Sequence, residues 1–233
     1  MKPNFLAVLL IAAVSVSFAS APGNVAVPWV DGERLLYTIS WKGLVIGRQV
    51  IEAHKSAAGW HYTGQVESNG LAELVGFDMS VSSYVRPDLH TRSFRRVLVV
   101  PREGKRVLEV TVDEQTHVSL TWVDGSVHRF SSNQTDVLDD ASVLYYVRVH
   151  PYAQKLWFVN YPRLIAGQLR ALGKKTVKTR LGRLAAEGYY FASEDTRIEV
   201  WYSVTKERWP LRIYFGQKWG GFTAELIKVE YVH

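Results

Sequence analysis

The chain has 233 residues, no cysteine and a formal net charge of +6, with 28 Lys and Arg against 22 Asp and Glu. The lack of cysteine excludes disulfides, thiol nucleophiles, thiolate metal ligands and the lipid-attachment site of lipoproteins. The mild positive charge is spread along the chain. It therefore permits contact with anionic partners but does not indicate a nucleic-acid binder.

Residues 1–19 have the layout of a secretory signal peptide. Lys2 precedes an apolar run from Phe5 to Val16, and small residues follow. This run is too short to span a bilayer, and no later run reaches the roughly 18 residues of a spanning helix. Without Lys2, 27 Lys and Arg remain against 22 acids, a net charge of about +5. We expect cleavage after Ala19 and a periplasmic protein that is neither a lipoprotein nor membrane-spanning.

Residues 20–31 contain Pro and Gly and are expected to form an extended leader. From there to the C-terminus, short runs rich in Val, Ile, Tyr, Trp and Thr alternate with polar residues, which is typical of β-strands. The strands are expected at 34–41, 44–53, 60–67, 79–86, 91–100, 105–113, 117–123, 126–130, 154–160, 174–179, 184–191, 197–204, 209–216 and 222–232. Residues 32–233 are therefore expected to form one all-β, mainly antiparallel domain: a curled sheet, spiral β-roll or half-barrel.

Three segments break this pattern. Residues 69–77 have helical spacing of apolar side chains. Residues 163–172 suit either a helix or a strand, and the central Gly167 favours neither. Residues 136–149 are expected to form one short buried helix, with Asp136 or Asp140 at its N-cap.

Adjacent Asp139 and Asp140 raise the alternative of an acid/base pair acting on a sugar. A glycosidase needs two carboxyl groups that face each other across a cleft. Neighbouring residues on a helix point about 100° apart, so the capping interpretation is favoured. The seven histidines are scattered without metal-ligand spacing, and no nucleophile or phosphate-binding motif is present.

The segment VLDDASVLYYVR, residues 137–148, resembles the interior signature of an exported bacterial family, domain of unknown function 3108. The opening GERLLYTISWKGLVIG resembles its N-terminal signature, through Gly32, Glu33, Tyr37, Trp41, Gly43 and Gly47. Further similar segments are KTRLGRLAA (178–186), VWYSVTKERWPLRI (200–213) and GGFTAELIKVE (220–230); YPRLIAGQLRAL (161–172) departs from the pattern. The resemblance implies an exported antiparallel β protein and no known catalytic residues.

Two surfaces are candidate binding sites, and neither implies a cofactor or metal. Leu71, Leu74, Val75 and Phe77 are expected either to plug the core or to line the mouth of an apolar cavity. Lys174, Lys178 and Arg180 share one strand face. They form either a solvated edge or a patch for an anionic partner.

The leading function is a non-catalytic envelope protein that binds a lipid-like ligand in a cavity of the curved sheet. A protein-interaction module of envelope assembly is the alternative, and a hydrolase of envelope polymers ranks third because no catalytic set is found.

Overall fold

The computed structural model describes residues 25–68, 78–100, 104–112, 118–123, 127–132, 134, 136–153, 155–160, 163–192, 197–217 and 220–232. In this part of the chain, fifteen strands form a single sheet and one α-helix, α1 (Ser142–Val149), follows β9. The strands are β1 (Glu33–Trp41), β2 (Leu44–Ser56), β3 (Gly59–Ser68), β4 (Asp78–Val85), β5 (Thr91–Val100), β6 (Gly104–Val112), β7 (Val118–Val123), β8 (Val127–Ser132), β9 (Val137–Leu138), β10 (Lys155–Asn160), β11 (Arg163–Thr179), β12 (Gly182–Ala192), β13 (Arg197–Ser203), β14 (Pro210–Gln217) and β15 (Gly220–Tyr231).

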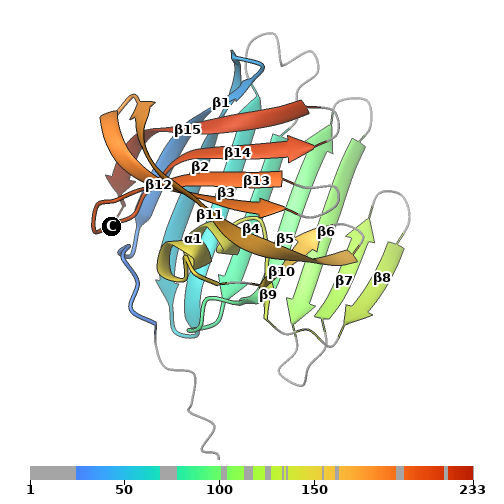
Figure 1. Ribbon diagram of the computed structural model, residues 1–233. Helices are drawn as coiled ribbons and strands as arrows, with labels where there is room; N and C mark the ends of the chain where they lie inside the picture. Colours follow the sequence, from blue (N-terminus) through green and yellow to red (C-terminus); the bar gives the residue numbers. More distant parts are fainter. Residues whose placement is uncertain are drawn as a thin grey trace, which may run out of the picture.

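The sheet is a meander whose first and last strands pair with each other. Except for β8 and β9, strands that follow each other in sequence lie side by side. Because β1 also pairs antiparallel with β15, β8 and β9 become the two ends of the sheet. All pairs are antiparallel except β9 with β10. No described strand joins β8 to β9, so the sheet curls without closing (Figure 1). The expected all-β fold with a curled, mainly antiparallel sheet is confirmed.

The first hairpin turns through two residues, as its sequence predicts. Trp41 pairs with Leu44, and the intervening Lys42 and Gly43 have φ angles of 47° and 84°. Positive φ at both central residues matches the twist of the flanking strands, and glycine adopts it at little cost. The turn therefore sets the register of β1 and β2 and leaves Leu44 exposed at its tip.

Helix α1 lies between the two walls of the curled sheet (Figure 1). The Tyr145 ring stacks on Tyr62 of β3, with ring centroids 4.0 Å apart. From the other wall, the Tyr202 hydroxyl of β13 donates a hydrogen bond to the Leu144 carbonyl at 2.9 Å. The helix thus covers apolar side chains of both walls, and it is buried as expected.

The helix begins later than its sequence suggests. Val137 and Leu138 form β9, which pairs with Trp157 and Phe158 of β10. Because this pairing holds the backbone extended, the helix starts only at Ser142, and the expected start near residue 136 is wrong.

Residues 163–172 form the first part of the long strand β11. Gly167 has a packing reason, because a Cβ atom there would lie 2.2 Å from the Phe191 ring. Without a side chain at residue 167, Phe191 of β12 can cover this part of the strand. Pairing with β10 and β12 resolves the choice between helix and strand in favour of the strand.

Candidate functional site

Asp139 is the capping residue of α1. Its Oδ1 accepts hydrogen bonds from the backbone N–H groups of Ala141 and Ser142 at 2.8 and 2.9 Å. The Ser142 hydroxyl in turn accepts from the Asp139 N–H at 2.8 Å. Asp136 and Asp140 are therefore not the caps. The residue that directly follows β9 supplies the acceptor, because it is the first whose side chain can reach the free N–H groups.

The same carboxylate ties the helix to the sheet. Its Oδ2 accepts hydrogen bonds from the hydroxyls of Ser83 on β4 and Thr91 on β5, at 2.6 and 2.7 Å. Complete burial raises the pKa of Asp139 even though these hydrogen bonds favour its charged form. Asp139 therefore has no solvent access, and its acceptor sites are used within the protein.

Asp140 points away from Asp139 and lies near the surface, where Arg96 Nη1 contacts it at 2.7 Å. The two carboxylates thus face different partners and do not converge on a cleft. This geometry agrees with the capping interpretation of the acidic pair.

A buried ion pair joins α1 to the first strand. The Arg148 guanidinium makes two hydrogen bonds to Glu33, at 2.5 and 3.0 Å, and donates one to the Glu207 carbonyl at 2.6 Å. Both charged side chains are at most 1% exposed. Burial disfavours the Arg148 charge, but the hydrogen bonds and charge of Glu33 outweigh it and raise the pKa of Arg148.

Aromatic rings surround this ion pair and fill the interior. The guanidinium carbon lies 4.9 Å from the Trp29 ring centroid and 5.3 Å from that of Tyr145. Trp29 belongs to the segment expected to be an extended leader, yet it is 4% exposed and packs into the core. A small void beside Arg148 and Tyr145 has no room for a water molecule. The packing around the ion pair therefore leaves no room for a ligand beside Arg148.

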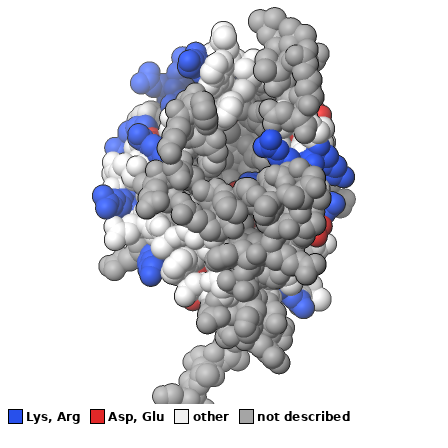
Figure 2. Space-filling view, turned by 90° about the vertical axis from the view of Figure 1, so that its right-hand side faces the viewer, with Lys and Arg blue, Asp and Glu red and all other residues white. Residues whose placement is uncertain are grey.

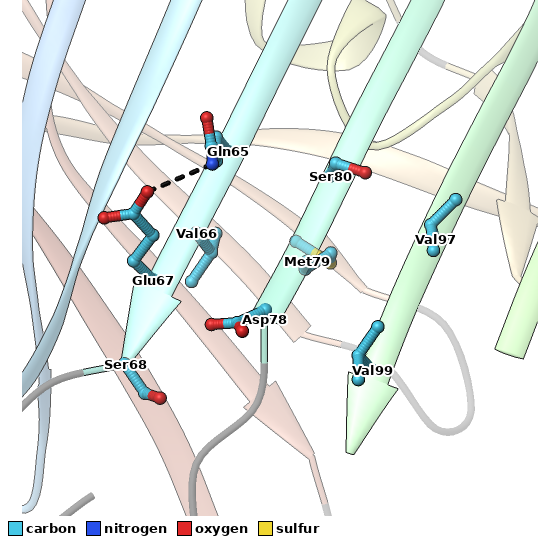
Figure 3. Close-up of a pocket in the computed structure, with 9 residues that line it drawn as sticks. All are labelled: Gln65, Val66, Glu67, Ser68, Asp78, Met79, Ser80, Val97 and Val99. Carbon is cyan, nitrogen blue, oxygen red and sulfur yellow. Dashed lines mark hydrogen bonds between the residues drawn. The ribbon is translucent and has the colours of Figure 1, made fainter. Parts of the chain in front are cut away.

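A hollow of about 440 Å³ lies where β3, β4 and β5 end (Figure 3). It has four apolar and five polar lining residues: Val66, Met79, Val97 and Val99, and Gln65, Glu67, Ser68, Asp78 and Ser80. The polar side chains include two carboxylates, so the hollow combines apolar surface with hydrogen-bonding groups. We call it the β3–β5 groove.

The strand register places most of this groove on the outer face of the sheet. Gln65, Ser80 and Val97 lie side by side across the three strands, whereas Val66 and Met79 form a second row that points toward the core. Val97 and Val99 point to the same side of β5 (Figure 3), and Val99 is 42% exposed. The groove is therefore accessible from solvent without opening the core.

The structure describes only one of the two candidate sites that were predicted from the sequence. Leu71, Leu74, Val75 and Phe77 lie outside the described residues, but the groove is built from strand ends on both sides of them, at Ser68 and Asp78. Lys174, Lys178 and Arg180 are all exposed. Lys174 and Lys178 share a face of β11 as expected, and Arg180 lies in the turn that follows.

Positive charge is not confined to this patch. On the side of the molecule seen in Figure 2, the described Lys and Arg side chains occupy several separate places and outnumber the acidic ones. This distribution agrees with the spread of basic residues along the sequence.

A cross-strand histidine pair was missed from the sequence. His54 of β2 lies directly opposite His61 of β3, because the turn between Ser56 and Gly59 has only two residues. Burial, followed by the neighbouring His54, lowers the pKa of His61, whose ring stacks on Tyr84 at 4.0 Å. The short connection between these two strands was the sequence feature that could have predicted this pairing. Among the described side chains, no three His, Asp or Glu gather in a way that could hold a metal ion.

Within the described part of the chain, no helix has the length and apolar character needed to cross a membrane.

Comparison with known proteins supports the fold and leaves the activity open. The chain is similar to the crystal structure of a β-barrel-like protein of domain of unknown function DUF1849 from Brucella abortus, with a TM-score of 0.61 and 11% identity, covering 87% of this chain and 99% of that one. A DUF1089 family protein from Pseudomonas aeruginosa aligns with a TM-score of 0.38 and 10% identity, over 73% of this chain and 90% of its own. A search of curated proteins found no match.

The sequence profile of one family covers most of the chain. It matches residues 36–227. This range includes most of the opening segment, from Leu36 onward, and the helix that carries Arg148. The chain therefore belongs to the family described as Protein of unknown function (DUF3108).

Proposed function

We propose that this protein is a non-catalytic periplasmic protein of the cell envelope, which binds an amphipathic, lipid-like ligand in the β3–β5 groove. The observation that carries the proposal is the groove itself. Its volume of about 440 Å³ lies in the range of small-molecule sites, and its lining is mixed apolar and polar.

The lining suits a ligand with an apolar chain and a polar head. Val97 and Val99 offer an apolar strip along β5, and Glu67 and Asp78 offer hydrogen-bond acceptors at the edge. A hydroxyl- or amine-bearing head would satisfy these carboxylates, whereas a purely hydrocarbon ligand would leave them desolvated. This arrangement favours a binder of amphipathic molecules over a carrier of plain hydrocarbons.

The exposed hairpin beside the groove supports access of such a ligand from an apolar environment. Leu44 and Val45 are 66% and 59% exposed, and three residues after Leu44 the same strand, β2, pairs Gly47 with Ser68 at the groove. Contiguous exposed apolar residues in a soluble protein often mark binding surfaces. The periplasmic location rests on the signal-peptide layout of residues 1–19.

The non-catalytic part of the proposal rests on the contacts made by the acidic residues Glu33 and Asp139. Glu33 and Asp139 are fully buried and each is bonded to protein partners. Neither can reach a substrate in the groove without unfolding the core, so these residues act as structural contacts.

Native mass spectrometry of the mature protein, purified from its own periplasm, tests this function. We expect a bound lipid-like molecule at stoichiometric level, identifiable after organic extraction, and its loss in the double variant Val97→Glu/Val99→Glu. Val30→Glu serves as the matched control, because Val30 is 55% exposed and lies outside the groove. Protein at its bare mass would contradict ligand binding, and equal retention in all variants would contradict the groove.

A second candidate, an interaction module of envelope assembly, is favoured by the open sheet. Within the described residues, β8 has a strand partner on one side only. An open edge can accept an extended segment of another protein as an additional strand. Co-purification of a partner that is lost when a proline is placed in β8, at Arg129, would support this function over ligand binding.

A further inference from the structure

The β11–β12 hairpin carries a set of exposed cations that the ligand-binding proposal does not use. We define the basic arm as Lys174, Lys178, Arg180 and Arg183. All four are exposed, and no ion pair is found for any of them among the described residues. Glu187 lies opposite Lys174, but its carboxylate bonds the Tyr189 hydroxyl at 2.6 Å and Arg208 at 3.6 Å.

One face of this hairpin packs against the sheet. Lys175 Nζ lies 3.4 Å from the centroid of the buried Trp201 ring, and Val177 is 1% exposed. Arg212 donates a hydrogen bond to the Lys178 carbonyl at 3.0 Å and also contacts Glu225. These contacts fix the hairpin, so the opposite face, with Lys174 and Lys178, points away from the protein.

The arm places like charges beside each other. Lys178 pairs in register with Arg183, so the two cations stand directly opposite on neighbouring strands. Such a pair is unfavourable in the absence of a counter-charge. A negatively charged surface would remove this repulsion. A strand edge that only faces water would gain nothing from two cations placed opposite each other.

An apolar side chain stands at the tip among these cations. Leu181 follows Arg180 in the turn and is 38% exposed, and Val204 of the adjacent loop is 52% exposed. The Val204 N–H donates to the Ala185 carbonyl, which holds this loop against the hairpin. Basic residues around an exposed aliphatic tip match the headgroup region of a bilayer, where charge and a shallow apolar contact act together.

We propose that the basic arm docks the protein on an anionic phospholipid surface, with Leu181 entering the headgroup layer. This docking is independent of the β3–β5 groove. Its partner is the lipid surface itself, and a soluble polyanion is the competing outcome.

Co-sedimentation of the chain that begins at residue 20 with phosphatidylcholine vesicles, with and without phosphatidylglycerol, tests the proposal. We expect binding only to the anionic vesicles, weakened by added salt because the charges are exposed. Each basic residue near the surface contributes about fivefold, so Lys174→Gln/Lys178→Gln/Arg180→Gln should bind about 100-fold more weakly.

Two controls separate the possible outcomes. Lys55→Gln/Arg92→Gln/Lys105→Gln removes the same charge from exposed positions elsewhere and should retain most of the binding. Leu181→Ser should weaken vesicle binding several-fold and leave binding of soluble polyphosphate unchanged. The proposal is overturned if both triple variants bind vesicles equally. It is also overturned if Leu181→Ser has no effect while polyphosphate competes fully, which would assign the arm to a soluble polyanion.

Discussion

Breaking the buried Glu33–Arg148 pair should be among the most destabilising single changes in this protein. Arg148→Met removes two hydrogen bonds to Glu33 and one to the Glu207 carbonyl, and leaves the Glu33 carboxylate buried without a counter-charge. Losing one partner of a buried pair costs about 3–5 kcal/mol of unfolding free energy. We expect a loss in this range at neutral pH, measured by urea denaturation of the mature chain.

The double variant tests whether this loss comes from the stranded charge. Replacing both partners by apolar side chains removes the desolvated groups together, so Glu33→Met/Arg148→Met should cost less than Arg148→Met alone.

A surface ion pair provides the matched control. Arg95 and Glu109 are 3.0 Å apart, and each side chain is 53% exposed. Arg95→Met should therefore cost less than about 1 kcal/mol. If Arg148→Met cost no more than Arg95→Met, or if the double variant were the least stable of the set, the reasoning about the buried pair would be refuted.

Three further perturbations test the local accounts. Asp139→Ala should cost about 3 kcal/mol in urea denaturation, because it leaves four donors without an acceptor, whereas Asp139→Asn should cost less; equal losses would contradict the capping role. Hydrogen bonds from His90 and the charges of His90 and Arg86 outweigh the effect of burial and lower the pKa of Asp88 from 3.8 to about 2. Asp88 therefore contributes about 1–2 kcal/mol above pH 4, after allowance for solvent screening, and this is lost as the pH falls toward 2; an unchanged acid transition in Asp88→Asn would argue against it. Gly188→Ala places a Cβ atom 2.7 Å from the Trp201 ring and should cost about 1–3 kcal/mol with a shift in tryptophan fluorescence, whereas unchanged stability would show that the ring can move freely.

The strands and the first hairpin could be predicted from the sequence because their information is local. Alternation of Leu35, Tyr37 and Ile39 identifies β1, and Lys42-Gly43 identifies its turn. The pairing of β1 with β15 could not be predicted this way, since it joins residues almost 200 positions apart. That distant pairing joins the two halves of the chain into a single sheet.

The residues of the candidate site also divide into features that the local sequence predicts and contacts that it does not. A capping acid before α1 was predictable, but its identity as Asp139 depends on where β9 ends. The contact between Glu33 and Arg148 spans 115 positions, and only their joint presence in the signature segments pointed to both. The groove depends on three strand ends meeting in register, which no single segment of sequence specifies.

Within the segments that resemble the family signatures, the buried charged residues make structural contacts. Glu33, Asp139 and Arg148 connect the helix to distant strands inside the sheet. Binding is expected instead on the outer face and at the hairpins, where surface residues can differ without disturbing these contacts.

Photoaffinity labelling with a diazirine-bearing fatty acid, followed by peptide mapping, tests the proposed binding site most directly. The account predicts that labelling concentrates on residues 65–68, 78–80 and 97–99, falls in Val97→Glu/Val99→Glu and persists in Val30→Glu. Labelling spread over the surface, or concentrated elsewhere and unchanged in the double variant, would contradict a lipid-like ligand in the β3–β5 groove.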